Sequence, residues 1–220
     1  MAALTYTYAT LTADIQSFVE DDSAEFVAAI PNIIGLGELR IYKDVELEVT
    51  KKEASVSLSS GVRTATKPSD YLFSRYAFIT DGGALQRLRL KDPSWIYDYW
   101  PSTTATDTPL FYASANSTQF LVAPTPDTSY TMTLGYVFRP DRLDGTTTTT
   151  WLSLNAPELL LYACLCESVA FLQELGQGPE PGMIQVWEQK YGDARTRVRD
   201  EEMRRQRMED ARFGENRGFV

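Results

Sequence analysis

The side chains that most often carry acid–base or nucleophilic chemistry are scarce in this sequence. Histidine is absent from all 220 residues, so the commonest general base, the usual partner of a nucleophilic serine or cysteine, and most zinc ligands are missing. The adjacent acids Asp21-Asp22 and Glu201-Glu202 are expected on different faces of a helix, where water solvates them. We therefore expect no enzyme activity, no metal site and no cofactor.

The cysteines and the glycine pair also favour structural roles. Cys164 and Cys166 lie two residues apart in an apolar run and point to different faces of a helix, so we expect buried free thiols. Gly35 and Gly37 lie within a helical pattern without the lysine of a phosphate-binding loop. These glycines either weaken the helix or mark a place where another backbone approaches closely, and we expect the close approach.

Four large rings fall within the six residues 95–100. Asp92-Pro93 predicts a short helix there, closed by Pro101. One short helix cannot bury four rings, and aromatic residues are enriched in the cores of interfaces. Either the rings fill the core of a sheet or some of them face a partner, and stacking on sugars or bases is a third reading. The predicted contacts with a partner protein are Trp95, Tyr97, Tyr99 and Trp100.

The charge of the chain argues against a protein that holds nucleic acid by its phosphates. The formal net charge is −9, and phosphate binding requires an excess of lysine and arginine. Between Asp193 and Arg212, seven arginines are nearly balanced by six acids. A DNA-binding tail would not neutralise its own arginines, whereas a protein-docking arm would.

Two helices near the C-terminus organise the rest of the chain. Asn155 and Pro157 are placed to start the first one, and the run of residues 159–166 is apolar on every face, which predicts a central core helix. A turn at residues 176–182 leads to a second helix, whose apolar stripe ends at Val198 although the helical composition continues to Arg212. The predicted docking residues on this free part are Arg195, Arg199, Glu202, Arg204, Arg205, Arg207, Met208 and Arg212.

The remaining elements place a β-rich segment between helices. Residues 11–19 and 23–30 predict short helices, and Pro31 is expected to end the second and start a third. Alternation begins at Val45, and later segments predict a hairpin at residues 81–83, another at 116–117 and a strand over 130–138. We therefore predict an α+β fold. Residues 1–46 and 151–220 form a helical bundle with a docking arm, and residues 47–150 form an antiparallel β-rich insertion.

The order of several motifs resembles the head-to-tail adaptor (connector) proteins of tailed bacteriophages, of the short-tailed type. The similar segments are residues 23–45, 98–101, 108–113, 121–127, 139–140 and 157–164, and the resemblance spans Leu4 to about Arg212. Lys67 departs from the pattern, because a hydrophobic residue is expected before Pro68.

The resemblance implies a structural virion protein. Such adaptors form a ring, usually dodecameric, between the portal protein and the tail nozzle, and DNA passes through the channel without sequence-specific binding. We expect assembly in the host cytoplasm, a final location at the head–tail junction and no contact with a membrane. An acidic channel wall would repel DNA phosphates. One alternative is a glycan-binding or glycan-cleaving tail accessory protein that uses the aromatic cluster and a carboxylate pair. The other is a nucleic-acid-binding protein that uses the arginine arm.

Overall fold

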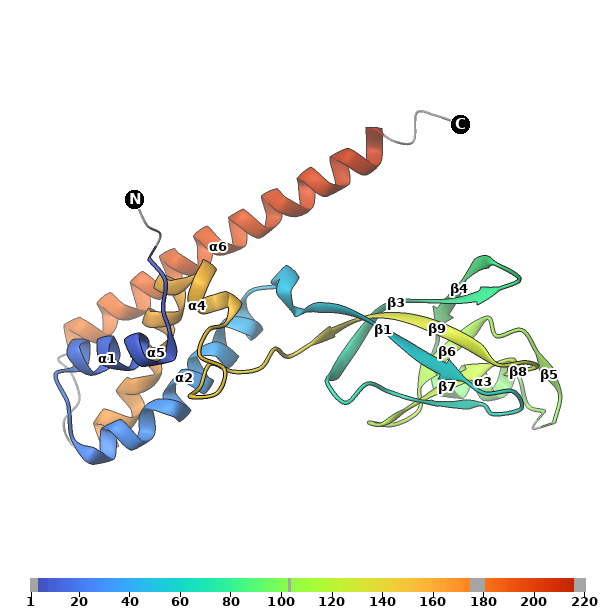
Figure 1. Cartoon of the computed structure of the whole chain (residues 1–220), viewed down its shortest axis with the longest axis horizontal. Coiled ribbons are helices and arrows are strands. Elements are labelled where there is room, and N and C mark those ends of the chain that lie inside the picture. The colour runs from blue at the N-terminus through green and yellow to red at the C-terminus, as the bar shows by residue number, and fades with distance from the viewer. Residues whose placement is uncertain (1–3, 103, 175–180, 216–220) are drawn as a thin grey trace. The chain divides into compact units, whose positions relative to one another are not determined.

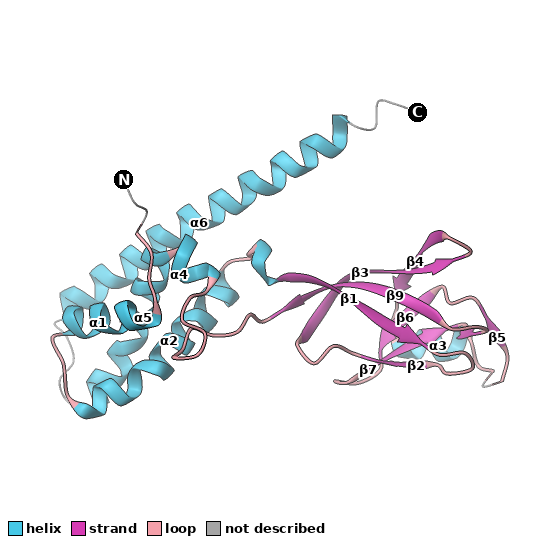
Figure 2. Cartoon of the chain, viewed as in Figure 1, coloured by secondary structure: helices cyan, strands magenta, loops and turns pink. Residues whose placement is uncertain are grey.

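The chain folds as an α+β protein, in agreement with the class predicted from the sequence. The computed structural model describes the backbone of residues 4–102, 104–174 and 181–215. The chain divides into two compact units, a helical unit (Met1–Val49 with Pro140–Val220) and a sheet unit (Thr50–Arg139). Figure 2 shows the strands gathered in the sheet unit, together with the short helix α3 (Pro93–Tyr99).

The helical unit is built on one hydrophobic core. Its helices are α1 (Tyr8–Val19), α2 (Ala24–Asp44), α4 (Trp151–Asn155), α5 (Pro157–Glu174) and α6 (Pro181–Glu215). Figure 1 shows α1, α2, α4 and α6 around α5. Side chains start two of the helices, since Thr7 accepts the Thr10 N–H and Thr150 accepts the Ser153 N–H as N-caps.

Helix α5 is the central core helix that its all-round apolar sequence predicts. Leu160, Ala163 and Leu165 are completely buried, and α1, α2, α4 and α6 all contact α5. Cys164 and Cys166 are free and buried in the same core, as expected. Within the described residues, no helix combines the length and the apolar character that crossing a bilayer requires.

The predicted helix break at Pro31 is wrong, because α2 runs continuously from Ala24 to Asp44. A proline inside a helix removes a backbone hydrogen bond and costs about 3 kcal/mol. Residues on both sides of Pro31 are buried in the core: Phe26, Ile30, Ile33 and Ile34. Burial of one such side chain contributes roughly 1.5–3 kcal/mol. Their combined burial therefore outweighs the local cost of the proline.

The predicted N-cap of the central helix at Asn155 is also wrong. Asn155 is the last residue of α4, and its Nδ2 donates a hydrogen bond to the Trp151 carbonyl at 3.0 Å. The capping box of Thr150 and Ser153 starts a helix one turn earlier than expected. Pro157 still opens α5, as predicted. Most of the predicted turn at residues 176–182 lies outside the described residues, and Pro181 and Gly182 belong to α6.

The two glycines of α2 have different surroundings. A Cβ atom built at Gly37 would lie 3.0 Å from the Cys164 Sγ and 3.1 Å from the Cys164 backbone nitrogen, so α2 and α5 approach closely there. A Cβ at Gly35 would meet only the Arg142 side chain, at 3.6 Å. The predicted close approach is confirmed at Gly37, and Gly35 makes an ordinary contact.

These surroundings predict opposite effects for two alanine substitutions. Gly37→Ala is expected to lower the free energy of unfolding by about 1–3 kcal/mol, because the new methyl group presses on backbone atoms of α5. Gly35→Ala is expected to raise it by up to about 1 kcal/mol, because alanine favours the helix. Urea denaturation of both variants measures the difference. Equal effects of the two substitutions would contradict the close packing at Gly37.

The sheet unit contains a mixed sheet that nearly closes into a barrel. Its strands are β1 (Lys51–Leu58), β2 (Thr64–Thr66), β3 (Tyr71–Asp81), β4 (Ala84–Leu90), β6 (Phe111–Ser114), β7 (Gln119–Ala123) and β9 (Tyr130–Phe138). The strand order is β1-β9-β3-β4-β6-β7-β2, and the two edge strands also contact each other. The β4–β6 pair is parallel and the other pairs of this sheet are antiparallel, so the prediction of an antiparallel β-rich part is wrong at β4–β6. The short strands β5 (Thr106–Asp107) and β8 (Thr125–Pro126) form a separate parallel pair.

Most of the predicted strands are confirmed. Asp81 pairs with Ala84 across Gly82 and Gly83, whose positive φ angles of 54° and 84° suit a tight hairpin turn. The hairpin of β6 and β7 and the strand β9 also agree with the sequence. The strand predicted from Val45 is wrong, because Val45 and Leu47 are buried in the core of the helical unit and β1 begins only at Lys51.

Lys67, which departs from the family pattern, is buried in the sheet unit. Its Nζ donates hydrogen bonds to the Ser114 Oγ and the Asn116 carbonyl, both at 2.6 Å. The same nitrogen lies 4.9 Å from the Tyr71 ring centroid and 5.0 Å from that of Phe120. Burial lowers the pKa of Lys67. Hydrogen bonds and cation–π contacts thus let a lysine occupy an apolar position.

Candidate interaction surfaces

The first half of α6 is held firmly on the helical unit. Trp187, Tyr191 and Ala194 are buried in its core, which confirms the apolar stripe predicted from the sequence. The stripe follows helical spacing, so all three side chains lie on one face of α6. This half of the helix therefore forms part of the folded core.

A polar network around Arg40 fixes the position of α6. The Arg40 guanidinium binds both carboxylate oxygens of Glu188, at 3.1 and 2.6 Å, and the Glu167 carboxylate at 3.3 Å. It also stacks over the Tyr191 ring, 4.3 Å from the centroid, and the Tyr191 hydroxyl donates a 2.7 Å hydrogen bond to Asp44. The network joins α2, α5 and α6, so the direction in which α6 leaves the core is set by several contacts.

Glu202 provides a further attachment point on α6. Only 3 % of this residue is exposed, and its carboxylate accepts hydrogen bonds from the Glu48 backbone N–H at 3.1 Å and pairs with Arg205 at 2.9 Å. The sequence placed Glu202 among the docking residues. In the structure its carboxylate is buried against its own chain, so Glu202 does not belong to an exposed docking surface.

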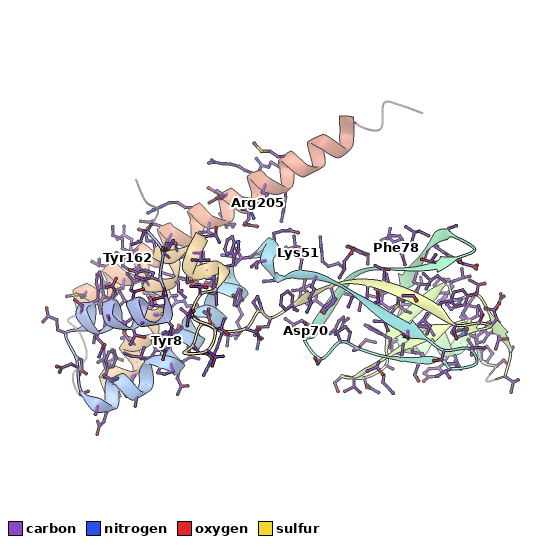
Figure 3. The ribbon with its side chains drawn as sticks, viewed as in Figure 1. Tyr8, Lys51, Asp70, Phe78, Tyr162 and Arg205 are labelled. Atoms are coloured by element: carbon purple, nitrogen blue, oxygen red, sulfur yellow. The ribbon has the colours of Figure 1, made fainter. Side chains whose placement is uncertain are left out.

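From Met203 to Met208, α6 continues with most of its side chains in solvent. Met203, Arg204, Arg205, Arg207 and Met208 are exposed, with 67 % of Met208 accessible. Figure 3 labels Arg205 on this part of the helix, and Figure 1 shows α6 extending past the other helices of its unit. We call residues 203–208 the exposed arm.

The other predicted docking residues differ in their surroundings. Arg195 is exposed and pairs with Asp44 at 3.3 Å, close to the core. Arg199 is exposed one turn further along. Arg212 belongs to α6, but its side chain lies outside those that the structure describes.

Helix α3 presents an aromatic platform on the sheet unit. Asp92 caps the helix and Pro93 occupies its first turn, as predicted, while Ile96 is completely buried against β6 and β7. The Trp95 and Tyr99 rings stack with their centroids 4.9 Å apart. Phe111 meets both rings edge-on, at 4.8 and 5.0 Å. Ring packing therefore gives α3 a defined orientation.

The four aromatic residues predicted as partner contacts differ in their exposure to solvent. Trp95 and Trp100 are half-buried, and the Trp100 Nε1 donates a 3.2 Å hydrogen bond to the Ala105 carbonyl. Tyr97 and Tyr99 are 55 % and 42 % exposed. The tryptophans thus complete the local core, and the tyrosines offer contact area to a partner.

A groove beside this platform was not predicted from the sequence. It has a volume of about 880 Å³ and lies between β3, β4 and β6. Three arginines and several leucines line the groove, among them Arg75, Arg87, Arg89, Leu85, Leu90 and Leu110. Phe111 lines the groove and also contacts the Trp95 and Tyr99 rings, so the groove and the platform form one continuous surface.

The sequence did contain a signal for the groove in β4. Leu85, Leu88 and Leu90 cannot all lie on one face of a strand, because successive side chains alternate. The structure buries Leu88 and leaves Leu85 71 % exposed and Leu90 also exposed. Leu85 lies on the same face of β4 as Arg87 and Arg89, and Leu90 lies at the end of the strand on the face of Leu88. Exposed leucines beside arginines are typical of an interaction surface.

The described residues contain no arrangement suited to catalysis by the cysteines or to metal binding. Burial raises the pKa of Cys166 to about 12 and raises that of Cys164 well above its ordinary range, so neither thiol is a ready nucleophile. In the part of the chain that the structure describes, no group of three cysteine, aspartate or glutamate residues could hold a metal ion. The prominent features are surfaces for binding other molecules.

An α+β protein with an exposed helical arm and an exposed aromatic platform has the features of a binding protein. The family model described as SU10 adaptor protein matches residues 6–213. The chain therefore belongs to the SU10 adaptor protein family, as its resemblance to phage head-to-tail adaptors predicted. It is a structural adaptor of a bacteriophage virion, a class of protein that contacts portal and tail components. No curated protein matches the chain.

Proposed function

We propose that the protein forms a closed ring that joins the portal to the tail nozzle around the DNA channel, with the twelve subunits that the resemblance to phage head-to-tail adaptors implies. The observation that carries this proposal is the exposed arm, which continues a helix fixed firmly to the core. A helix of this length gains little stability from its own solvated turns. An ordered extension is therefore suited to binding a second protein.

The chemistry of the arm fits docking on the portal. Met203 and Met208 supply adaptable apolar contacts, and Arg204 and Arg207 supply charge-assisted hydrogen bonds. The acids nearby in the sequence nearly balance these arginines, which favours specific pairing with a protein over binding to phosphates. Arg195, Arg199 and Arg212 extend the proposed surface along the same helix.

The domain organisation follows from the same proposal. Residues 1–46 and 151–220 would act as a helical bundle that carries the arm, and residues 47–150 as an inserted β-rich part. Trp95, Tyr97, Tyr99 and Trp100 would then face the tail nozzle or a neighbouring subunit. Assembly would take place in the host cytoplasm, and the acidic chain would repel the DNA that passes through the channel.

Removal of the arm tests this function. A chain that ends at Glu202 keeps the buried contact with Glu48 and loses the exposed residues. It is expected to fold normally and to bind the portal protein of the same phage at least about 100-fold more weakly, because it loses the central contacts of the interface. Native mass spectrometry of the mixed proteins measures the complex.

Point substitutions supply the matched control for the truncation. Arg204→Ala combined with Arg207→Ala and Met208→Ala is expected to weaken portal binding in the same direction. Lys190→Ala, an exposed change on the packed half of α6, is expected to leave binding unchanged. Full portal binding by the chain that ends at Glu202 would refute the docking role of the arm.

A further inference from the structure

The arginines and leucines that line the groove of the sheet unit favour binding of an acidic partner. Arg75, Arg87 and Arg89 line it together with the exposed Leu85 and Leu90. Among the residues that the structure describes, no carboxylate forms an ion pair with any of these three arginines. An incoming surface would need carboxylates to neutralise the arginines and apolar groups to cover the leucines.

The two units of the chain carry opposite charge. The sheet unit contains nine lysines and arginines against seven acids, a formal balance of +2. The helical unit contains twelve basic residues against twenty-three acids, a balance of −11. The helical unit therefore carries the net negative charge that the groove requires of a partner, and every further copy of the chain contains the same two units.

From this complementarity we infer that the groove receives the acidic helical unit of a second copy of this chain. The inference rests on the proposed function and deepens it, because it names the surface that would join one subunit to the next. The two contacting surfaces are different parts of the chain, so the contact is heterologous, and heterologous contacts generate a ring when the rotation closes. A contact between two identical patches would stop at a dimer.

The aromatic platform extends the contact area of the groove. Tyr99 packs edge-on against Phe111, and the Lys91 Nζ lies 4.8 Å from the Trp95 ring centroid, at the junction of the two surfaces. Tyrosine and arginine are the residue types that contribute most to protein interfaces. Groove and platform together would thus present arginines flanked by rings to the acidic unit.

Photo-crosslinking from inside the groove tests the inference. The photoreactive residue p-benzoylphenylalanine replaces Leu85 in the full chain, which is then assembled with the portal protein and irradiated. We expect a product of twice the mass of the chain, with the attachment site in the helical unit. Conjugates with the portal alone, attachment within one chain, or no product would each overturn the inference. The same probe at Thr131, an exposed residue of β9 outside the groove, is the matched control and is expected to give no such product.

A charge reversal separates this contact from portal docking. Arg89→Glu is expected to reduce the crosslinked product at least about tenfold, because it opposes the acidic surface with a like charge. Arg139→Glu makes the same charge change at an exposed position outside the groove and is expected to change the yield less than twofold. Circular dichroism confirms that both variants fold. An undiminished product from Arg89→Glu would overturn the inference, whereas loss of portal binding by the chain that ends at Glu202 bears only on the arm.

Discussion

Replacing Trp187 with alanine is expected to lower the free energy of unfolding of the helical unit by about 3–5 kcal/mol. Trp187 is the largest buried side chain on the stretch of α6 that packs against α5. The substitution removes its apolar contacts and leaves a cavity, which the surrounding helices can fill only in part.

The loss of Trp187 is also expected to loosen the helix that carries the exposed arm, because Trp187 packs α6 onto the core. With Trp187→Ala, the amides of α6 between Ile184 and Val198 are expected to exchange hydrogen faster than those of α2, since local opening of α6 becomes easier. Hydrogen exchange with mass spectrometry resolves the two helices, and urea denaturation gives the total loss.

The neighbouring residue Val186 provides the control for this prediction. Val186 lies on the same helix and is exposed, so Val186→Ala is expected to change stability by less than about 0.5 kcal/mol. A loss below about 1 kcal/mol for Trp187→Ala would mean that the Arg40 network, rather than apolar burial, holds α6.

Glu38→Gln is expected to stabilise the protein at pH 7, by roughly 2 kcal/mol. Glu38 is completely buried, and this burial is the main cause that raises its pKa from the ordinary 4.5 to about 6. Hydrogen bonds from the Leu143 N–H at 3.0 Å and the Thr150 hydroxyl at 3.4 Å act in the opposite direction, as does Arg142, whereas Asp144 adds to the rise. A neutral glutamine avoids the cost of the buried charge and can still accept the Leu143 hydrogen bond.

The pH dependence of this effect has a definite sign. A pKa that is higher in the folded state means that the folded protein binds the proton more tightly, so stability falls as pH rises from about 4.5 to about 6. Below this window the carboxyl group is neutral in both states, and Glu38→Gln gives almost no gain. Above it the full gain is present. Urea denaturation of both proteins between pH 4 and pH 8 measures the difference.

Two comparisons make the Glu38 prediction specific. Glu38→Ala leaves the Leu143 N–H without its acceptor and opens a cavity, so it is expected to destabilise the protein by about 2–4 kcal/mol. Glu25→Gln, an exposed change on the same helix, is expected to change stability by less than about 0.5 kcal/mol at any pH. A Glu38→Gln gain that is equal at pH 4 and pH 8 would show that the charge of Glu38 is not the cause.

Much of the local structure of this protein was predictable because its signals lie within a few residues of one another. The Asp81-Gly82-Gly83 turn, the Asp92 cap of α3 and the alternation of β9 each depend on neighbouring residues, and each is confirmed. Pro31 shows the limit of such signals. Its effect is local and unfavourable, whereas the burial of Ile30 and Ile33 that overrides it depends on the distant helix α5.

The interaction surfaces were predictable only in part for the same reason. Helical spacing located the packed stripe of α6, and composition located the exposed arm beyond it. The direction in which Glu202 points depends on the Glu48 backbone, which lies far away in the sequence. The groove depends on β4 meeting β6 in a parallel pair, and no local pattern specifies which strands become neighbours.

The sequence alone therefore determined the α+β class and the presence of a solvated helical arm, since composition, capping and periodicity act over short distances along the chain. The order of its motifs indicated the family by resemblance. Only the tertiary structure decided that Glu202 turns inward, that Gly37 but not Gly35 lies against another backbone, and that three arginines gather with exposed leucines in one groove. Those features arise where segments far apart in the sequence meet, and the free energy of such contacts belongs to the whole fold.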